Sequence, residues 1–190
     1  MTINYQFVHL VEKMSNSDKD IRFMATNDML TELQKDTFKL DDDNERKLVA
    51  AMLKILHDNS GEVQNLGVKC ICRLIERCRE TSAERIVDNL SQELVGESTE
   101  DRLRDISSLG LKAACQSLNP NSTVARRVAT RLVNALAQQG HTVAVLLDVL
   151  DILSDLIAKQ GHHLQSLHEL SVAHILPYLK VCVRPFGVCE

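Results

Sequence analysis

A helical pattern that recurs about every 40 residues constrains this chain most. Apolar residues at helical spacing form short stretches that turn residues separate, and these stretches come in pairs. A helical hairpin repeated at this period is typical of HEAT and armadillo arrays, and two helices per unit favour HEAT. We predict helix pairs at residues 4–14 with 18–35, 43–57 with 61–79, 83–95 with 99–117 and 121–139 with 142–160, and a ninth helix at 164–180.

The second helices of these pairs can be aligned with one another. The alignment matches Ile21, Val63, Leu103 and Val143. A second helix in such an array packs on its hairpin partner and on both neighbouring repeats, so residues three and four positions further on are expected to be buried. Small residues among them, such as Gly67, predict a close approach of two helices. The residues expected to be buried are Met24, Ala25, Leu66, Gly67, Ile106, Leu146 and Leu147.

The breaks between the stretches carry helix start and stop signals. Ser17, followed by Asp20 three residues later, predicts the start of one helix. Asp41–Asp43 opens another, where carboxylates suit the positive end of the helix dipole. Gly140 and Gly161 are expected to adopt the left-handed conformation that ends helices.

Composition agrees with a long-helix protein and excludes several classes of partner. Hydrophobic residues make up 44% of the sequence but aromatic residues only 3%, which fits helices better than a β-sandwich. The net charge is −4 and no run of Lys and Arg indicates a nucleic-acid or membrane surface. The sequence has neither a signal peptide nor a stretch of about 18 apolar residues that could span a bilayer. We therefore expect a protein of the cytoplasm and nucleus.

The side chains that could carry catalysis do not form a recognisable site. The six cysteines are expected to be free thiols, with Cys70 and Cys78 at core positions on one helix face, and no Cys-x-x-Cys pair suggests zinc. The densest histidine group, His162, His163 and His168, lacks the one-turn spacing of helical zinc ligands. No nucleophile elbow or glycine-rich phosphate loop occurs. We predict no catalytic, metal-binding or cofactor-binding residue.

Charged residues at helical spacing have a structural interpretation and a functional one. Asp148, Asp151 and Asp155 lie within about 60° of arc on one helix face. They form either a solvated acidic stripe or a surface that steers a basic protein partner. Arg22 and Arg104 take equivalent places in their repeats, and for both we favour a structural role such as pairing with Asp between repeats.

Several blocks of the sequence resemble one protein family in order and spacing. The blocks are DKDIRFMATNDMLTELQKD (18–36), LDDDNERK (40–47), GEVQNLGVKC (61–70) and LRDISSLGLK (103–112), with VLDILSDLIAKQG (149–161) as a weaker fifth. Together they resemble the N-terminus of the cullin-associated and neddylation-dissociated proteins, over roughly residues 5 to 180.

The resemblance implies a non-enzymatic regulator of cullin–RING ubiquitin ligases. Members of that family are long HEAT solenoids that wrap a cullin with its RING subunit, bind cullins that lack the ubiquitin-like modifier, block neddylation and support exchange of substrate receptors. Their N-terminal repeats embrace the cullin C-terminal region and the RING subunit. The resemblance implies an all-α, right-handed superhelix of four HEAT repeats and a partial fifth over residues 1–180. Residues 181–190 form an unmatched tail, because Pro185 and Gly187 oppose another helix.

This chain is far shorter than the family, so we expect an N-terminal fragment, a truncated gene model or a short splice form. The alternative function is another HEAT scaffold, such as a transport or phosphatase adaptor. A third class, a metal- or carboxylate-dependent hydrolase, has the least support. The candidate partner-binding residues are Asp18, Asp20, Asp41, Asp42, Asp43, Asp148, Asp151 and Asp155.

Overall fold

The computed structural model describes residues 2–96, 100–119, 123–138, 140–161, 164 and 172–173. Eight α-helices lie in these residues, with no strand among them. The predicted ninth helix and the predicted tail fall outside the described residues, apart from Leu164, Val172 and Ala173. The helices are α1 (Thr2–Lys13), α2 (Lys19–Gln34), α3 (Asp42–Leu56), α4 (Gly61–Ile75), α5 (Glu80–Val95), α6 (Asp101–Ser117), α7 (Thr123–Ala137) and α8 (Val143–Gln160).

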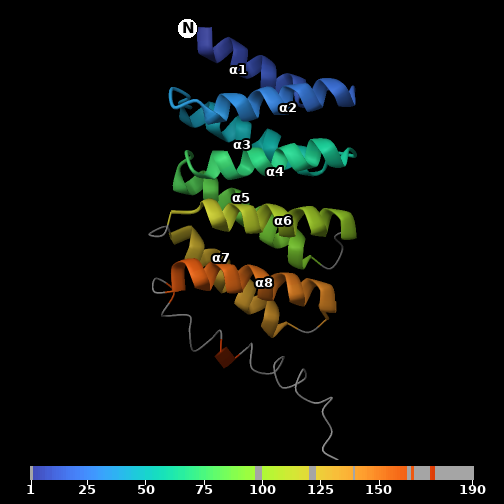
Figure 1. Ribbon diagram of the computed structural model, residues 1–190, viewed down its shortest axis with the longest axis vertical. Helices are drawn as coiled ribbons and strands as arrows, with labels where there is room; N and C mark the ends of the chain where they lie inside the picture. The colour runs from blue at the N-terminus through green and yellow to red at the C-terminus, as the bar shows by residue number, and fades with distance from the viewer. Residues whose placement is uncertain are drawn as a thin grey trace, which may run out of the picture.

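The helices form a stack of four hairpins in two layers. Each odd-numbered helix packs on the even-numbered helix that follows it, and each even-numbered second helix packs on the next second helix. In Figure 1 the second helices α2, α4, α6 and α8 lie one below another in the front layer and run in the same direction. The predicted all-α HEAT-repeat architecture is therefore confirmed for the described hairpins.

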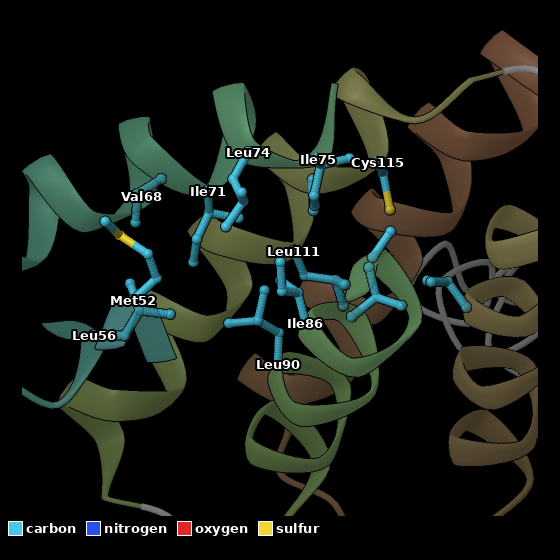
Figure 2. Close-up of a cluster of buried hydrophobic side chains, with 14 of the residues drawn as sticks. Met52, Leu56, Val68, Ile71, Leu74, Ile75, Ile86, Leu90, Leu111 and Cys115 are labelled. Atoms are coloured by element: carbon cyan, nitrogen blue, oxygen red, sulfur yellow. The ribbon is translucent and has the colours of Figure 1, made fainter. Parts of the chain in front are cut away.

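A single apolar core runs through all four hairpins. Around α4, the side chains of Val68, Ile71 and Leu74 are buried, and Met52 of α3 and Ile86 of α5 belong to the same cluster (Figure 2). No hairpin could bury its apolar faces alone, so each repeat depends on its neighbours for stability.

The predicted close approach at Gly67 is confirmed. A Cβ atom on Gly67 would lie 2.6 Å from Cγ2 of Ile55 and 3.3 Å from Cδ2 of Leu56. The absence of a side chain thus lets α4 press against its hairpin partner α3. Ala25 and Ile106 are also buried as predicted, with 2% and 8% of their surface exposed.

The predicted alignment of the second helices is wrong at the fourth repeat. The residues that precede the second helices are Asp18, Ser60, Glu100 and Thr142. Counting from these caps matches Ile21, Val63 and Leu103 with Val145, which is 3% exposed, and not with Val143, which is 72% exposed. The shift of two residues moves Leu147 to the solvent side.

Three of the seven residues expected to be buried are therefore not buried. Leu147 is 62% exposed and Leu146 is half-buried, because the true register turns α8 away from the predicted orientation. Met24 is 64% exposed although its register is correct. Its counterpart Leu66 lies one turn before Cys70, whose Sγ donates to the Thr26 carbonyl of α2. That side of a second helix faces the preceding one, and α2 has no preceding second helix among the described residues.

Several helix ends differ from prediction. Asp18 caps α2 in place of Ser17. Gly140 has the predicted positive φ of 107°, but Gly161 has a right-handed conformation with φ −55°. Helix α4 ends at Ile75, so Cys78 lies in the following turn and does not share a helix face with Cys70.

The described cysteines are free thiols, as predicted. Burial raises the pKa of Cys70, Cys78 and Cys115 to about 12. These thiols therefore remain protonated at neutral pH, which makes them poor nucleophiles and metal ligands.

Candidate partner-binding surface

The predicted acidic residues near α2 lie on two opposite edges of the stack. Second helices begin at one edge, which we call the start edge and which carries Asp18 and Asp20. First helices begin at the other edge, which we call the far edge and which carries Asp41–Asp43. A helix of about 16 residues separates the two edges by roughly 24 Å. The two predicted groups of carboxylates therefore do not form one surface.

At the start edge, the predicted residues Asp18 and Asp20 are exposed. Asp18 also shapes the chain locally, because its Oδ1 accepts from the Asp20 backbone N at 2.8 Å and so caps α2. The backbone N of Asp18 in turn donates to Oδ1 of Asn16 at 2.8 Å. A partner could reach these carboxylates, but binding there would compete with the cap.

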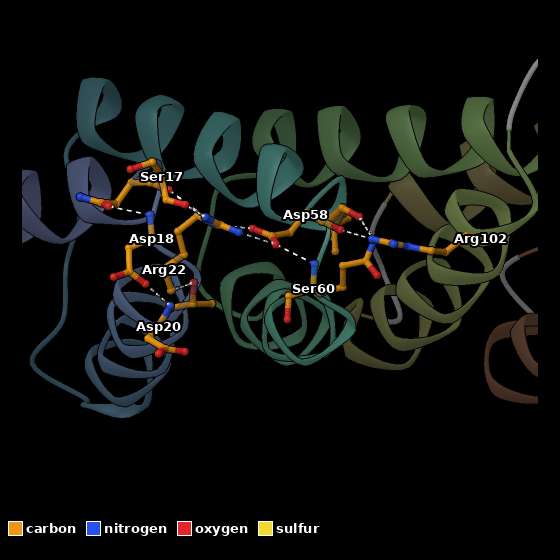
Figure 3. Close-up of polar contacts among 11 residues, drawn as sticks. Ser17, Asp18, Asp20, Arg22, Asp58, Ser60 and Arg102 are labelled. Atoms are coloured by element: carbon orange, nitrogen blue, oxygen red, sulfur yellow. Dashed lines mark hydrogen bonds and ion pairs between the residues drawn. The ribbon is translucent and has the colours of Figure 1, made fainter.

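A ladder of polar contacts links three repeats along the start edge, and its central residue, Asp58, was not predicted from the sequence (Figure 3). Arg22 of α2 donates from Nε to Oδ2 of Asp58 at 2.5 Å and from Nη2 to Oδ1 at 2.9 Å. Arg102 of α6 donates to the backbone carbonyl of the same Asp58. The side chain of Asp58 is only 6% exposed, so this carboxylate joins repeats and is not offered to a partner.

The charges of this ladder lower the pKa of Asp58. The hydrogen bond from Arg22 is the main cause, and a hydrogen bond from the Ser60 backbone N at 2.8 Å adds to it. The structural role predicted for Arg22 is thus confirmed as an inter-repeat pair. Arg104 differs, because it forms an ion pair with Asp101 at 2.6 Å, one turn earlier in its own helix.

At the far edge, the three predicted carboxylates begin α3 and are partly used inside the protein. Asp41 caps the helix by accepting from the Asn44 backbone N at 2.8 Å. Asp42 forms an ion pair with Arg79 of the next repeat. Asp43 pairs with Lys47 at 2.6 Å, and this hydrogen bond lowers the pKa of Asp43. All three remain exposed to solvent.

The acidic group on α8 lies beside one lysine of the neighbouring second helix. Asp151 and Asp155 are exposed and Asp148 is half-buried. Lys112 of α6 forms an ion pair with Asp151. That hydrogen bond, with the fields of Asp148 and Asp155, raises the pKa of Lys112. One cation therefore offsets part of the acidic charge on this face.

Large apolar side chains of α6 and α8 are exposed on the layer of second helices. Their exposure was not predicted from the sequence. Val143 and Leu147 lie on α8, and Leu109, which is 48% exposed, lies on α6. The Thr142 cap could have revealed the two α8 residues, because its hydroxyl accepts from the Val145 backbone N and so defines where the helix begins. Leu109 had no comparable signal.

No three His, Cys, Asp or Glu side chains within the described part of the chain are placed to hold a metal ion. The histidines His162, His163 and His168 lie outside the described residues. None of the helices that the structure describes is both long and apolar enough to cross a membrane.

Comparisons with known proteins point to one group of relatives. No family model matches the chain. It is 45% identical over 177 residues to cullin-associated NEDD8-dissociated protein 2 of Mus musculus, and 43% identical over 182 residues to protein 1 of that name from Drosophila melanogaster. The Dictyostelium discoideum protein 1 is 38% identical over 183 residues.

These matches cover 90% to 93% of this chain but only 14% to 15% of the relatives' length. Among solved structures, the MAST/Orbit N-terminal domain is similar with a TM-score of 0.44 and 15% identity, over 92% of this chain and 97% of that domain. An engineered protein has a TM-score of 0.42 and 13% identity, over 95% of this chain and 90% of the other.

Proposed function

Because this chain is homologous to one segment of the cullin-associated NEDD8-dissociated proteins, we propose that it is a non-enzymatic module that binds a cullin together with its RING subunit. The observation that carries the proposal is identity of 38% to 45% across about nine-tenths of the chain, in relatives from a mouse, a fly and an amoeba. The relatives' names state cullin association and NEDD8 dissociation, and we extend the first property to this chain.

The proposed binding is specific for a cullin that lacks NEDD8. By occupying the cullin C-terminal region and the RING subunit, the module would hinder neddylation and contribute to substrate-receptor exchange. This chain spans 14% of the length of its mouse and fly relatives, so it supplies one part of such a wrapping interaction. A solenoid that wraps a partner gathers affinity from many linked contacts, and one segment should therefore bind far more weakly than a full-length relative.

The layer of second helices is the proposed contact surface. Its exposed side carries Asp151 and Asp155 on α8, and carboxylates of this kind steer a basic partner. Asp18 and Asp20 at the start edge and Asp41–Asp43 at the far edge flank the first repeats, and we assign them a rim position. Rim charges act mainly on the association rate and its dependence on salt.

Binding measurements on immobilised cullin–RING complexes, with and without NEDD8, test the proposal. We expect binding to the unmodified complex, weaker binding to the modified one, and a loss of affinity as salt rises, since charges are screened over about 8–10 Å at physiological ionic strength. Reversing Asp148, Asp151 and Asp155 to Lys together should slow association.

A matched control reverses three exposed carboxylates elsewhere, at Asp28, Asp36 and Glu76. Equal affinity for both complexes, or none for either at high protein concentration, would remove the cullin proposal. The chain would then stand as a HEAT scaffold for a different partner.

A further inference from the structure

The outer side of α8 is an exposed helix face with two chemically different halves. Val143 and Leu147 lie one turn apart in its first half, 72% and 62% exposed. Asp151 follows after another turn with its side chain 61% exposed, and Asp155 after one more. Residues four apart lie on one side of a helix, so these four form a continuous strip that is apolar at one end and acidic at the other.

The neighbouring helix α6 widens the apolar half. Lys112 of α6 pairs with Asp151 of α8, and Lys159 of α8 donates to the carbonyl of Gln116, one turn further along α6. The two contacts follow the same order on both helices, which agrees with the parallel course of α6 and α8 in Figure 1. Leu109 lies nearly one turn before Lys112, and Leu147 one turn before Asp151. The pairing therefore brings the two exposed leucines to adjacent turns.

Exposed apolar side chains gathered on neighbouring helices are typical of binding surfaces, whereas scattered ones are ordinary. Here Val143 and Leu147 lie one turn apart on α8, Leu109 lies on the adjoining α6, and the three side chains are 72%, 62% and 48% exposed. Lys112 pairs with Asp151 and Lys159 donates to the Gln116 carbonyl, so the three carboxylates Asp148, Asp151 and Asp155 outnumber the two cations beside them. An occupant that complements this face has apolar side chains followed by cationic ones.

The other end of the second-helix layer does not suit the same occupant. Phe23 and Met24 are also exposed, but they are consecutive residues on a single turn of α2. The outer side of the adjoining α4 carries Lys69 and Arg73. Arg73 is paired with Glu76 at 3.0 Å, and Lys69 remains to repel a basic segment. Charge complementarity thus selects α8 and α6 over α2 and α4.

We propose that the outer face of α8, widened by Leu109 of α6, is a docking surface for a basic amphipathic helix of a protein partner. This inference rests on the proposed function, since it names the chemistry of the partner segment that this layer would receive. Apolar side chains of the segment cover Val143, Leu147 and Leu109, and its Lys or Arg side chains reach Asp155. This mode of recognition lays the apolar side of a helix on a complementary apolar surface.

The test measures binding of two probes to the full chain and to matched variants. One probe is a fluorescent peptide with Leu and Lys at helical spacing, followed by anisotropy. A peptide with Glu in place of Lys controls for charge, and the unmodified cullin–RING complex is the second probe. The α8 variants are Leu147→Ser and Asp155→Asn, and the matched α2 variants are Met24→Ser and Asp28→Asn. All four change exposed residues, so the fold should be retained, which circular dichroism checks.

We expect Leu147→Ser to weaken binding of the Leu–Lys peptide by about tenfold. Asp155→Asn should weaken peptide binding less and should reduce the dependence of that binding on salt. The α2 variants and the Leu–Glu peptide are the controls that distinguish binding specific to α8 and to cationic peptides from general binding. Equal binding by the α8 and α2 variants would overturn the docking surface, whatever the cullin–RING result. If Leu147→Ser impairs peptide binding but no variant binds the cullin–RING complex, the docking surface stands and the proposed function fails.

Discussion

Helices α2 and α4 hold the same place in successive repeats, yet they bury different amounts of surface. Along the side of α4 that faces α2, the residues Val63, Leu66, Cys70 and Leu74 are all at least 92% buried. The corresponding residues of α2 are Ile21, Met24, Asp28 and Glu32. Met24 and Asp28 are exposed, and Ile21 and Glu32 are half-buried. This side is apolar in α4, which packs on a preceding second helix, and largely polar in α2, which has no preceding second helix among the described residues.

This difference shows how the surface of a repeat depends on whether another repeat stacks on it. A terminal repeat needs polar residues where interior repeats use apolar ones, because nothing stacks on its outer side. In α2, two carboxylates replace the thiol and the leucine that α4 buries. Met24 is the exception, because it is apolar and yet exposed on this side of α2. Exchanging residues between α2 and α4 tests how far their equivalent sides differ.

The largest effect is expected when the polar residue of α2 is placed in α4. Cys70→Asp would bury an unpaired carboxylate among apolar side chains, which should cost roughly 3–5 kcal/mol of the free energy of unfolding. The reciprocal change Asp28→Cys, at an exposed position, should alter that free energy by less than about 0.5 kcal/mol. Urea unfolding of both variants measures the difference. Similar losses in the two would mean that the sides of α2 and α4 are not equivalent.

The next largest loss of stability is expected when the apolar residue at one equivalent position of α4 and α2 is truncated. Leu66→Ala leaves a cavity between α4 and its neighbours and should cost about 2–3 kcal/mol, since Leu66 is 8% exposed. Met24→Ala removes a side chain that is 64% exposed and should cost less than about 0.5 kcal/mol. Thermal unfolding of the two variants under one condition checks this order. A Met24 variant that loses as much as the Leu66 variant would place Met24 in the core.

A somewhat smaller loss is expected at the contact between α4 and its hairpin partner. Gly67→Leu adds a side chain where a Cβ alone would lie 2.6 Å from Ile55, so the two helices must move apart, at a cost of roughly 1–3 kcal/mol. Gly61→Leu serves as the control, because no atom lies within 4 Å of a Cβ placed there. An unchanged melting temperature for Gly67→Leu would contradict the close packing of α3 and α4.

The smallest effect concerns the polar link between the first and second repeats, and it depends on pH. Arg22 lowers the folded-state pKa of Asp58 below its unfolded value. The pair therefore contributes its full stabilisation above the unfolded pKa of about 4, and this contribution disappears as the pH falls through the lower, folded value.

Asp58→Asn should remove this part of the acid dependence of stability, as should Arg22→Met. Lys35→Met, which breaks an exposed pair with Glu32 at the C-terminal end of α2, should not. The measurement is the free energy of unfolding between about pH 2 and 6. If wild type and Asp58→Asn lose stability in parallel over this range, Asp58 does not stabilise the repeat contact.

Much of the local structure could be predicted from the sequence, because local patterns determine it. The eight described helices lie where apolar periodicity indicated them, and the approach of α3 and α4 at Gly67 follows from a missing side chain. Start and stop residues were less certain, since neighbouring groups compete for the same role. Ser17 and Asp18 both have the chemistry of a cap, and Asp18 takes the position. Gly161 is able to adopt a left-handed conformation but does not.

The candidate binding residues were harder to predict than the fold. The arc of Asp148, Asp151 and Asp155 follows from helical spacing alone, but their nearness to Lys112 depends on how α8 packs on α6. The grouping of Asp18 and Asp20 with Asp41–Asp43 joined residues that are close in sequence and lie at opposite ends of α2. Asp58 did not stand out, because a turn Asp has the same appearance whether or not an arginine of another repeat reaches it.

The helices, their pairing into hairpins, the repeat period and the family resemblance all follow from the sequence alone. Each of these depends on residues near one another in the chain or on a pattern that recurs along it. The packed structure alone shows that Met24 and Leu147 face solvent and that Arg22 of one repeat pairs with Asp58 of the next. Burial and ion pairing between repeats depend on which helices stack on which sides, and no local pattern records whether a neighbour is present.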